Sequence, residues 1–174
     1  GGSMFLWSTG ETMGSITVCP QMTETYYVTV TDNNGCSDMD DVTVTVNPNP
    51  IAYAGPDVAI CEGECTTLTA TGGSMFLWST GETMGSITVC PQMTETYYVT
   101  VTDNNGCTDM DEVTVSVNPL PNADAGTDVS ICAGDCTTLS ATGGTTFVWN
   151  TGETMASITV CPSATETYYV TVTD

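Results

Sequence analysis

The fold of this chain is decided by residues 97–117, which read YYVTVTDNNGCTDMDEVTVSV. The segments 97–102 and 113–117 alternate apolar residues with Thr or Ser, which is the pattern of a strand that buries one face. The Asn-Asn-Gly of residues 104–106 separates them and favours a tight turn. We therefore expect an antiparallel hairpin whose Tyr and Val side chains face a core, with Thr on the solvated face.

Four shorter segments upstream have the same strand character and are separated by Gly, Ser, Thr and Pro. Six short strands at this spacing, with no helical periodicity, predict an all-β chain built from antiparallel β-sandwiches. The upstream strands are expected at residues 57–60, 66–70, 75–78 and 86–89. The predicted core comprises Leu68, Ala70, Phe76, Ile87, Val89 and the tryptophans Trp7, Trp78 and Trp149.

The sequence repeats itself at a constant period. The motif at 1–7 returns at 72–78 and, diverged, at 143–149, which gives a period of 71, and residues 1–50 differ from 72–121 at only four positions. We therefore expect tandem, interchangeable modules whose contribution to the protein depends on how many copies are present. The predicted units are a partial module at 1–48 (strands C to G), a complete module at 49–119 and a partial module at 120–174 (strands A to F). Proline-rich linkers such as 118–121 leave little slack between modules.

The charge composition excludes several classes of function. The chain has no Lys, Arg or His against 21 Asp and Glu, so its formal net charge is −21. Such a surface cannot neutralise phosphates, so we expect no nucleic-acid binding. No apolar run is long enough to span a bilayer, so we expect no membrane insertion. No His, Lys or Arg is available for acid–base, Schiff-base or oxyanion chemistry, so the chain is not expected to be an enzyme.

Several short motifs recur from unit to unit. The second unit carries the elements AGPDV (54–58), WSTGE (78–82), ITV (87–89), YYVTVTD (97–103) and NGC (105–107), with counterparts in the other units. This pattern resembles the PKD-like or immunoglobulin-like tandem repeats of Bacteroidota cell-surface and gliding-type adhesins. The resemblance implies seven-stranded immunoglobulin-like sandwiches, export from the cell and a spacer or adhesive role. The chain differs from the common pattern by its added Cys65 and Cys90 and by its lack of basic residues.

Each complete unit has four cysteines, and sandwich topology suggests how they pair. Strands B and E are neighbours, so disulfides are expected at Cys65–Cys90 and Cys136–Cys161, with Cys19 unpaired because its partner would precede Gly1. A three-thiolate zinc site is the alternative. Cys61 and Cys107 are expected at opposite ends of one module, where each could bond a neighbouring module; an internal Cys61–Cys107 bond is the alternative. The candidates for inter-module disulfides are Cys36, Cys61, Cys107 and Cys132.

The acidic residues gather at the expected loops, where no basic side chain can pair with them. Calcium takes several hard oxygen ligands, and Asp103, Asn105, Asp109 and Asp111 around the 104–106 turn form the candidate site. The alternative is a merely solvated acidic surface. No other cofactor is expected.

Two functions fit these observations. The first is a structural segment of a secreted, disulfide-stabilised extracellular filament or stalk, whose partners are neighbouring modules. The second is an adhesin module that binds surface glycans or protein, for which Tyr98 on the outer strand face is the candidate contact. Met75, Leu77 and Met84 also lie outside the core register, which indicates a packing surface or a partly covered strand edge. Near-identical units with short loops favour the first function.

Overall fold

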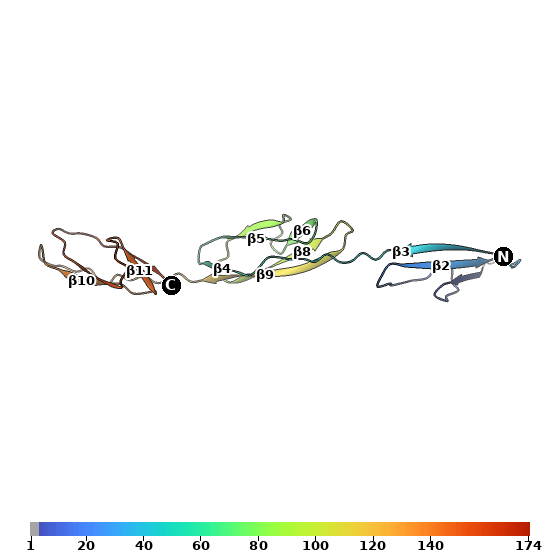
Figure 1. Cartoon of the computed structure of the whole chain (residues 1–174), viewed down its shortest axis with the longest axis horizontal. Helices are drawn as coiled ribbons and strands as arrows, with labels where there is room; N and C mark the ends of the chain where they lie inside the picture. The colour runs from blue at the N-terminus through green and yellow to red at the C-terminus, as the bar shows by residue number, and fades with distance from the viewer. Residues whose placement is uncertain (1–3) are drawn as a thin grey trace. The chain divides into compact units, whose positions relative to one another are not determined.

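The computed structural model describes residues 4–174 and contains only strands as regular elements (Figure 1). The all-β prediction is therefore confirmed for this part of the chain. No described segment is a helix long and apolar enough to cross a membrane. The strands of the described residues are β1 Met4–Trp7, β2 Glu24–Thr31, β3 Ser37–Val44, β4 Val58–Cys61, β5 Thr66–Thr69, β6 Met75–Trp78, β7 Ser86–Val89, β8 Glu95–Thr102, β9 Thr108–Asn118, β10 Thr137–Ser140, β11 Thr146–Trp149, β12 Ser157–Val160 and β13 Val170–Thr173.

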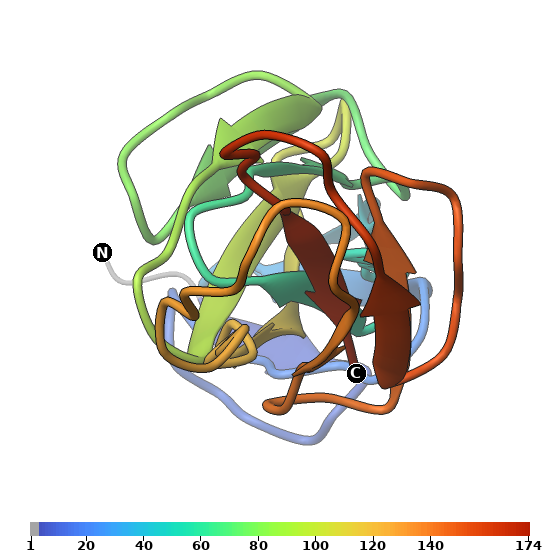
Figure 2. The ribbon, with the colours of Figure 1, turned by 90° about the vertical axis from the view of Figure 1, so that its left-hand side faces the viewer.

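The strands form several antiparallel sheets, distributed over two compact units. The first unit contains the sheet β1-β2-β3, the pair β5-β7 and most of the four-stranded sheet β4-β9-β8-β6. The second contains the pairs β10-β12 and β11-β13, which face the viewer in Figure 2. The first unit consists of the residues up to Val58, Cys65–Val89 and Glu95–Val115. The second consists of Ala59–Glu64, Cys90–Thr94 and Ser116–Asp174. The boundaries proposed from the sequence at 48 and 119 stay a prediction.

The strand pairings recur in the same register at corresponding positions of the three sequence repeats. Met4 lies opposite Thr31 in β1-β2, Met75 opposite Thr102 in β6-β8, and Thr146 opposite Thr173 in β11-β13. Each of these positions exceeds the previous one by 71. Because a register slip of one residue would turn the apolar face outward, equal registers put the same side chains on the same face each time.

The predicted core lies where the alternation placed it in the second repeat. Val99, Val101, Val113 and Val115 are at most 1% exposed. Trp78 is also buried, and its indole Nε1–H donates to the carbonyl oxygen of Met84 at 2.9 Å. In the third repeat a core cluster forms from Ala141, Trp149, Ile158 and Val160, and Leu139, Phe147, Tyr168 and Val170 pack against it.

The prediction for Trp7 was wrong, because this side chain is only half-buried. Its indole Nε1–H still donates to the Met13 carbonyl at 2.9 Å. In the second repeat the pair β5-β7 supplies buried Leu68 and Ile87, whereas residues 4–48 form only the sheet β1-β2-β3. The first repeat therefore has no second sheet among its described residues to cover the indole.

Two strands expected in the third repeat are absent or shortened. Residues 129–132, the counterpart of β4, form no strand, and β13 begins at Val170 although its counterpart β8 begins at Glu95. A strand requires a ladder partner, and in the second repeat β9 lies between β4 and β8. No described segment of the third repeat corresponds to β9, so both segments lack the neighbour that orders them in the second repeat.

The Gly72-Gly73 pair lies directly after the Tyr53–Thr71 bridge, where other backbone segments come very close. Gly72 has a φ of 111°, and a Cβ there would overlap the carbonyl group of Ile51. A Cβ on Gly73 would lie 2.6 Å from the Thr102 carbonyl oxygen. The backbones approach so closely at this point that only glycine fits.

Replacing Trp78 by Ala should lower the free energy of unfolding of the second repeat by about 3–5 kcal/mol, because it opens a cavity in a packed core. Trp7→Ala is the matched control and should cost much less, since Trp7 is only half-buried. Urea unfolding followed by circular dichroism measures both effects. Equal costs for the two variants would contradict the core described here.

Candidate functional site

A disulfide fastens one end of the β10-β12 pair. Cys136 and Cys161 are bonded with a sulfur–sulfur distance of 2.04 Å and a Cα–Cα distance of 4.1 Å. Cys136 directly precedes Thr137 and Cys161 directly follows Val160, and these two strand residues lie opposite one another. The strand register thus brings the two cysteines together, as the sequence predicted.

The counterparts in the second repeat, Cys65 and Cys90, are also disulfide-bonded. They flank the facing residues Thr66 and Val89, which is the arrangement of the third repeat shifted by one period. The bonded state of each of these two cysteines agrees with the predicted Cys65–Cys90 disulfide. A sulfur held in a disulfide is no thiolate ligand, so the alternative of a zinc site using Cys61, Cys65 and Cys90 is not supported.

The other cysteines of the chain carry free thiols. Cys61 and Cys107 are both unbonded, so the alternative of an internal bond between them is not formed. Cys107 is half-buried, and the other free thiols are exposed. These are Cys19, Cys36, Cys61 and Cys132, of which Cys19 was expected to be unpaired.

The predicted calcium ligands Asp103 and Asn105 meet in one tight turn. One Asp103 carboxylate oxygen accepts from the backbone N–H groups of Asn105 at 2.8 Å and Cys107 at 2.9 Å, and the other lies 3.2 Å from the Asn105 side-chain amide. Partial burial of Asp103 works against its charged form, but these donors outweigh it and hold the pKa of Asp103 below its ordinary value. The carboxylate thus fixes the turn that the sequence predicted.

The predicted ligands Asp109 and Asp111 contact a different segment. Their carboxylates accept the backbone N–H groups of Ala52 and Ala54, each at 2.9 Å. Asp57 completes the arrangement from the other side, because its carboxylate accepts the Thr114 N–H at 2.8 Å. Along this edge of β9, the three carboxylates accept backbone N–H groups that a neighbouring strand's carbonyl oxygens would otherwise accept. The sequence pattern alone does not predict this role of the aspartates.

The four candidate calcium ligands therefore have partners within the protein. Within residues 4–174 no group of three or more Asp, Glu, Cys or His side chains is arranged to hold a metal ion. Charge-assisted hydrogen bonds from backbone amides occupy part of the acceptor capacity of these carboxylates. Calcium binding stays a prediction.

Tyr97 and Glu95 form a second carboxylate contact beside the core. The Tyr97 hydroxyl donates to a Glu95 carboxylate oxygen at 2.9 Å, and the tyrosine is 4% exposed. Burial, followed by the hydrogen bond to Glu95 and its negative charge, raises the pKa of Tyr97 to about 12. The same contact recurs as Tyr26 with Glu24 and as Tyr168 with Glu166.

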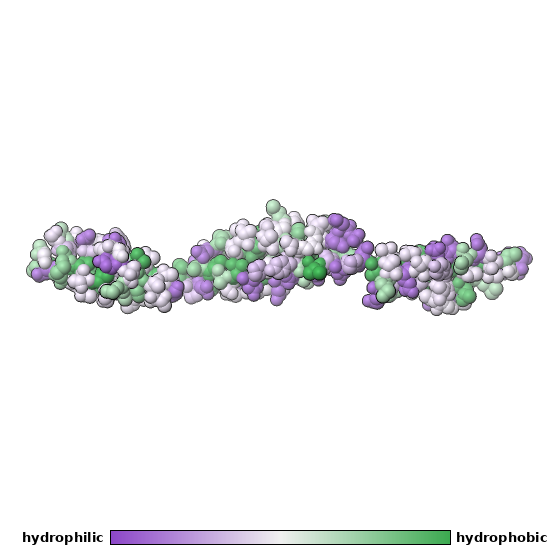
Figure 3. All heavy atoms as spheres, in the orientation of Figure 1, coloured by the Kyte–Doolittle hydropathy of each residue, from purple (hydrophilic) through white to green (hydrophobic). Residues whose placement is uncertain are grey.

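The outer face of the β6-β8-β9 sheet carries exposed apolar side chains. Leu77 lies opposite Thr100, which in turn lies opposite Met110, so these three form one row across the strands. Leu77, Met110 and Tyr98 are between 45% and 62% exposed. Leu6, Met39 and Tyr27 repeat this arrangement in the first repeat. Figure 3 shows hydrophobic and hydrophilic residues interspersed over the face in view.

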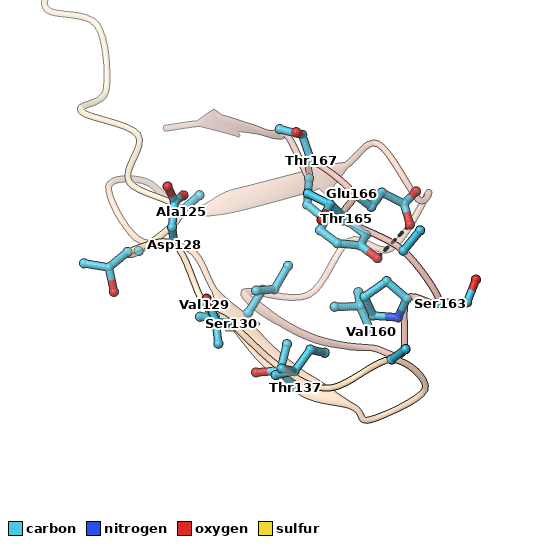
Figure 4. A pocket seen from close by; sticks show the side chains of 18 of the residues that line it. Ala125, Asp128, Val129, Ser130, Thr137, Val160, Ser163, Thr165, Glu166 and Thr167 are labelled. Atoms are coloured by element: carbon cyan, nitrogen blue, oxygen red, sulfur yellow. Dashed lines mark hydrogen bonds between the residues drawn. The ribbon is translucent and has the colours of Figure 1, made fainter.

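A cavity of about 630 Å³ opens in the third repeat (Figure 4). Residues 125–133 line one side of it, and residues 162–168, including the Tyr168–Glu166 hydrogen bond of 3.0 Å, line another. In the second repeat the counterparts of these two segments include β4 and the start of β8, which have β9 between them. The cavity therefore corresponds to the sheet position of a β9-like strand, and we assign no ligand to it.

Comparison with protein-family models finds no match, and comparison with the curated proteins finds none either. Among solved structures, a Bacteroides ovatus protein described as SGBP-B of the mixed-linkage glucan utilization locus, in complex with a mixed-linkage heptasaccharide, aligns with 97% of this chain at 15% identity. The TM-score is 0.22, and the alignment spans 53% of that chain. A likeness at this TM-score carries no argument. The PKD-like resemblance stays an expectation from the sequence.

Replacing Asp111 by Ala should destabilise the second repeat by about 1–3 kcal/mol, because it leaves the buried Ala54 N–H without its acceptor. The matched control is Asp40→Ala in the first repeat, where the exposed carboxylate accepts the N–H of the adjacent Asp41. The control should change stability by less than about 0.5 kcal/mol. Urea midpoints of the two variants test this, and an unchanged Asp111→Ala midpoint would show that the carboxylate is merely solvated.

Alkaline pH should destabilise the second repeat through Tyr97. Its pKa is about 12 in the folded chain and near 10 when unfolded, so the folded state retains a proton that the unfolded state loses. This contribution is fully present below pH 10 and is lost as the pH rises towards 12. In a tyrosinate absorbance titration, Tyr97→Phe should remove a component that ionises near pH 12. An unchanged titration curve would contradict the assignment.

Proposed function

We propose that this chain is a structural, load-bearing segment of an extracellular filament or stalk. The observation that carries the proposal is the recurrence of one strand register and one disulfide position from repeat to repeat. Bonded cysteines flank β5-β7 at 65 and 90 and β10-β12 at 136 and 161. Persistent disulfides are typical of oxidising compartments, which supports an extracellular location.

The distribution of polar groups supports the same role. The chain has no basic side chain, and carboxylates such as Asp109, Asp111 and Asp103 accept backbone N–H groups within the fold. Among residues 4–174 no buried side-chain nitrogen or oxygen lacks a hydrogen-bond partner. These three carboxylates thus serve the fold itself, which suits a repeat whose contribution is length and resistance to unfolding.

The second candidate function is adhesion, and the exposed sheet face favours it. Tyr98 and its counterparts Tyr27 and Tyr169 are each at least 45% exposed. An exposed aromatic ring on a flat strand face is a suitable surface for stacking on a neutral sugar. Such a surface recurring along one chain would also gain affinity from multiple contacts.

Force spectroscopy on the full chain distinguishes the two functions. The Cys136–Cys161 bond closes 25 residues, so reduction should add about 80–90 Å to the extension released by the third repeat. Cys136→Ser should give the same increase without reductant. The matched control is Cys132→Ser, which removes a nearby free thiol and should leave the extension unchanged.

The load-bearing proposal fails if the oxidised chain extends without discrete unfolding steps. A glycan array provides the other arm of the test. Binding of neutral glycans that is lost when Tyr27, Tyr98 and Tyr169 are all replaced by Ala would support adhesion in its place.

A further inference from the structure

Two asparagines at the same position of the repeat, Asn118 and Asn47, are each approached by a cysteine-bearing segment. At the end of the second repeat, the Asn118 oxygen accepts the N–H of Glu62, the residue directly after Cys61, at 2.8 Å. Asn47 is the counterpart of Asn118 in the first repeat, since 47 plus 71 is 118. The Asn47 oxygen lies 3.9 Å from the Cys107 Sγ atom.

Both contacts therefore belong to the same position of the repeat. The segment of Cys61 reaches the asparagine of its own repeat, and Cys107 reaches the asparagine of the preceding repeat. In two consecutive complete repeats, the Cys107 thiol of one and the residue directly after Cys61 of the other would thus contact one carbonyl oxygen. Both thiols are free, and Cys61 is exposed at the end of β4.

Cys61 and Cys107 of one repeat cannot form this contact with each other. The eleven-residue strand β9 begins directly after Cys107 and ends at Asn118, beside Cys61. At the rise of an extended strand these ends are about 35 Å apart, whereas a disulfide needs Cα atoms within about 7 Å. A disulfide partner for either thiol must therefore come from outside its own pair, and the shared asparagine position brings to it the complementary thiol of a neighbouring repeat.

We propose that this asparagine marks a disulfide between consecutive repeats, formed by the Cys61 position of one and the Cys107 position of the next. The proposal rests on the structural role proposed above and adds to it a redox-dependent covalent bond between repeats, called here the inter-repeat disulfide. Cys36 and Cys132 occupy the same two positions in the first and third repeats. Residues 1–48 contain no Cys61 counterpart, so the bond is tested in a chain that supplies one.

The bond forms by oxidation of two thiols. One cysteine, as thiolate, attacks a disulfide oxidant such as oxidised glutathione, and the second cysteine then displaces the glutathione from the mixed disulfide. Two sulfur–hydrogen bonds are replaced by one sulfur–sulfur bond, and the two electrons and two protons leave with the oxidant as two glutathione thiols. The inter-repeat disulfide can therefore be reduced again by excess thiol.

The test uses the full chain with a copy of residues 51–71 placed before Gly1. This copy gives the first repeat the counterparts of β4 and β5, with a copied Cys61 and a copied Cys65. After oxidation in a glutathione buffer, a protease that cuts at acidic residues digests the chain, which has no Lys or Arg for trypsin. Mass spectrometry should find one peptide pair linking the copied Cys61 to Cys107, with two free thiols lost.

Two substitutions sharpen the result. Cys107→Ser should abolish the linked peptide, whereas Cys36→Ser should retain it, because Cys36 occupies the same turn in a repeat with no predecessor in this chain. A bond from Cys19 to the copied Cys65 reports that the completed repeat has folded. If that bond forms and Cys107 remains fully open to alkylation, the proposed inter-repeat disulfide is wrong. The load-bearing role of the individual repeats is tested separately, by the force measurement.

Discussion

The carboxylate contacts that join the segments of this chain depend on one constraint, which is that none of its 21 Asp and Glu side chains can meet a basic side chain. A carboxylate near a protein core is costly unless it is hydrogen-bonded. Here the backbone supplies the donors. Asp109 and Asp111 on β9 accept the N–H groups of Ala52 and Ala54, and Asp103 accepts those of its own turn. Negative charge thereby becomes a means of joining segments 57 residues apart in the sequence.

This constraint relates the stability of the repeat to its proposed role. The buried tryptophan core, the disulfides flanking β5-β7 and β10-β12, and the carboxylate contacts all lie within individual repeats. A unit stabilised in this way can be copied without a new partner for each copy, which is the property a spacer requires. The outer strand face, with Tyr98 and its counterparts, is the surface left for contacts with other molecules.

Much of this fold could be predicted from the alternation of apolar residues, because burial of one strand face leaves a pattern of period two. That pattern located β6 and β7 and the Val99 and Val101 core. It placed the start of the last strand at Val113, although β9 begins at Thr108. The intervening TDMDE has no apolar alternation, and its strand state depends on pairing with β8 and on the acceptor role of its Asp residues. Such roles arise from tertiary proximity and leave no local signal in the sequence.

The central claim is that carboxylates replace a strand partner along β9, and hydrogen exchange of single amides tests it most directly. Residues 52–54 contain their own benchmark, because Tyr53 pairs with the backbone of Thr71 while Ala52 and Ala54 donate to carboxylates. The account predicts that the Ala52 and Ala54 amides of the full chain exchange as slowly as that of Tyr53. Exchange of these two alanines at the rate of an unprotected amide, with Tyr53 protected, would contradict it.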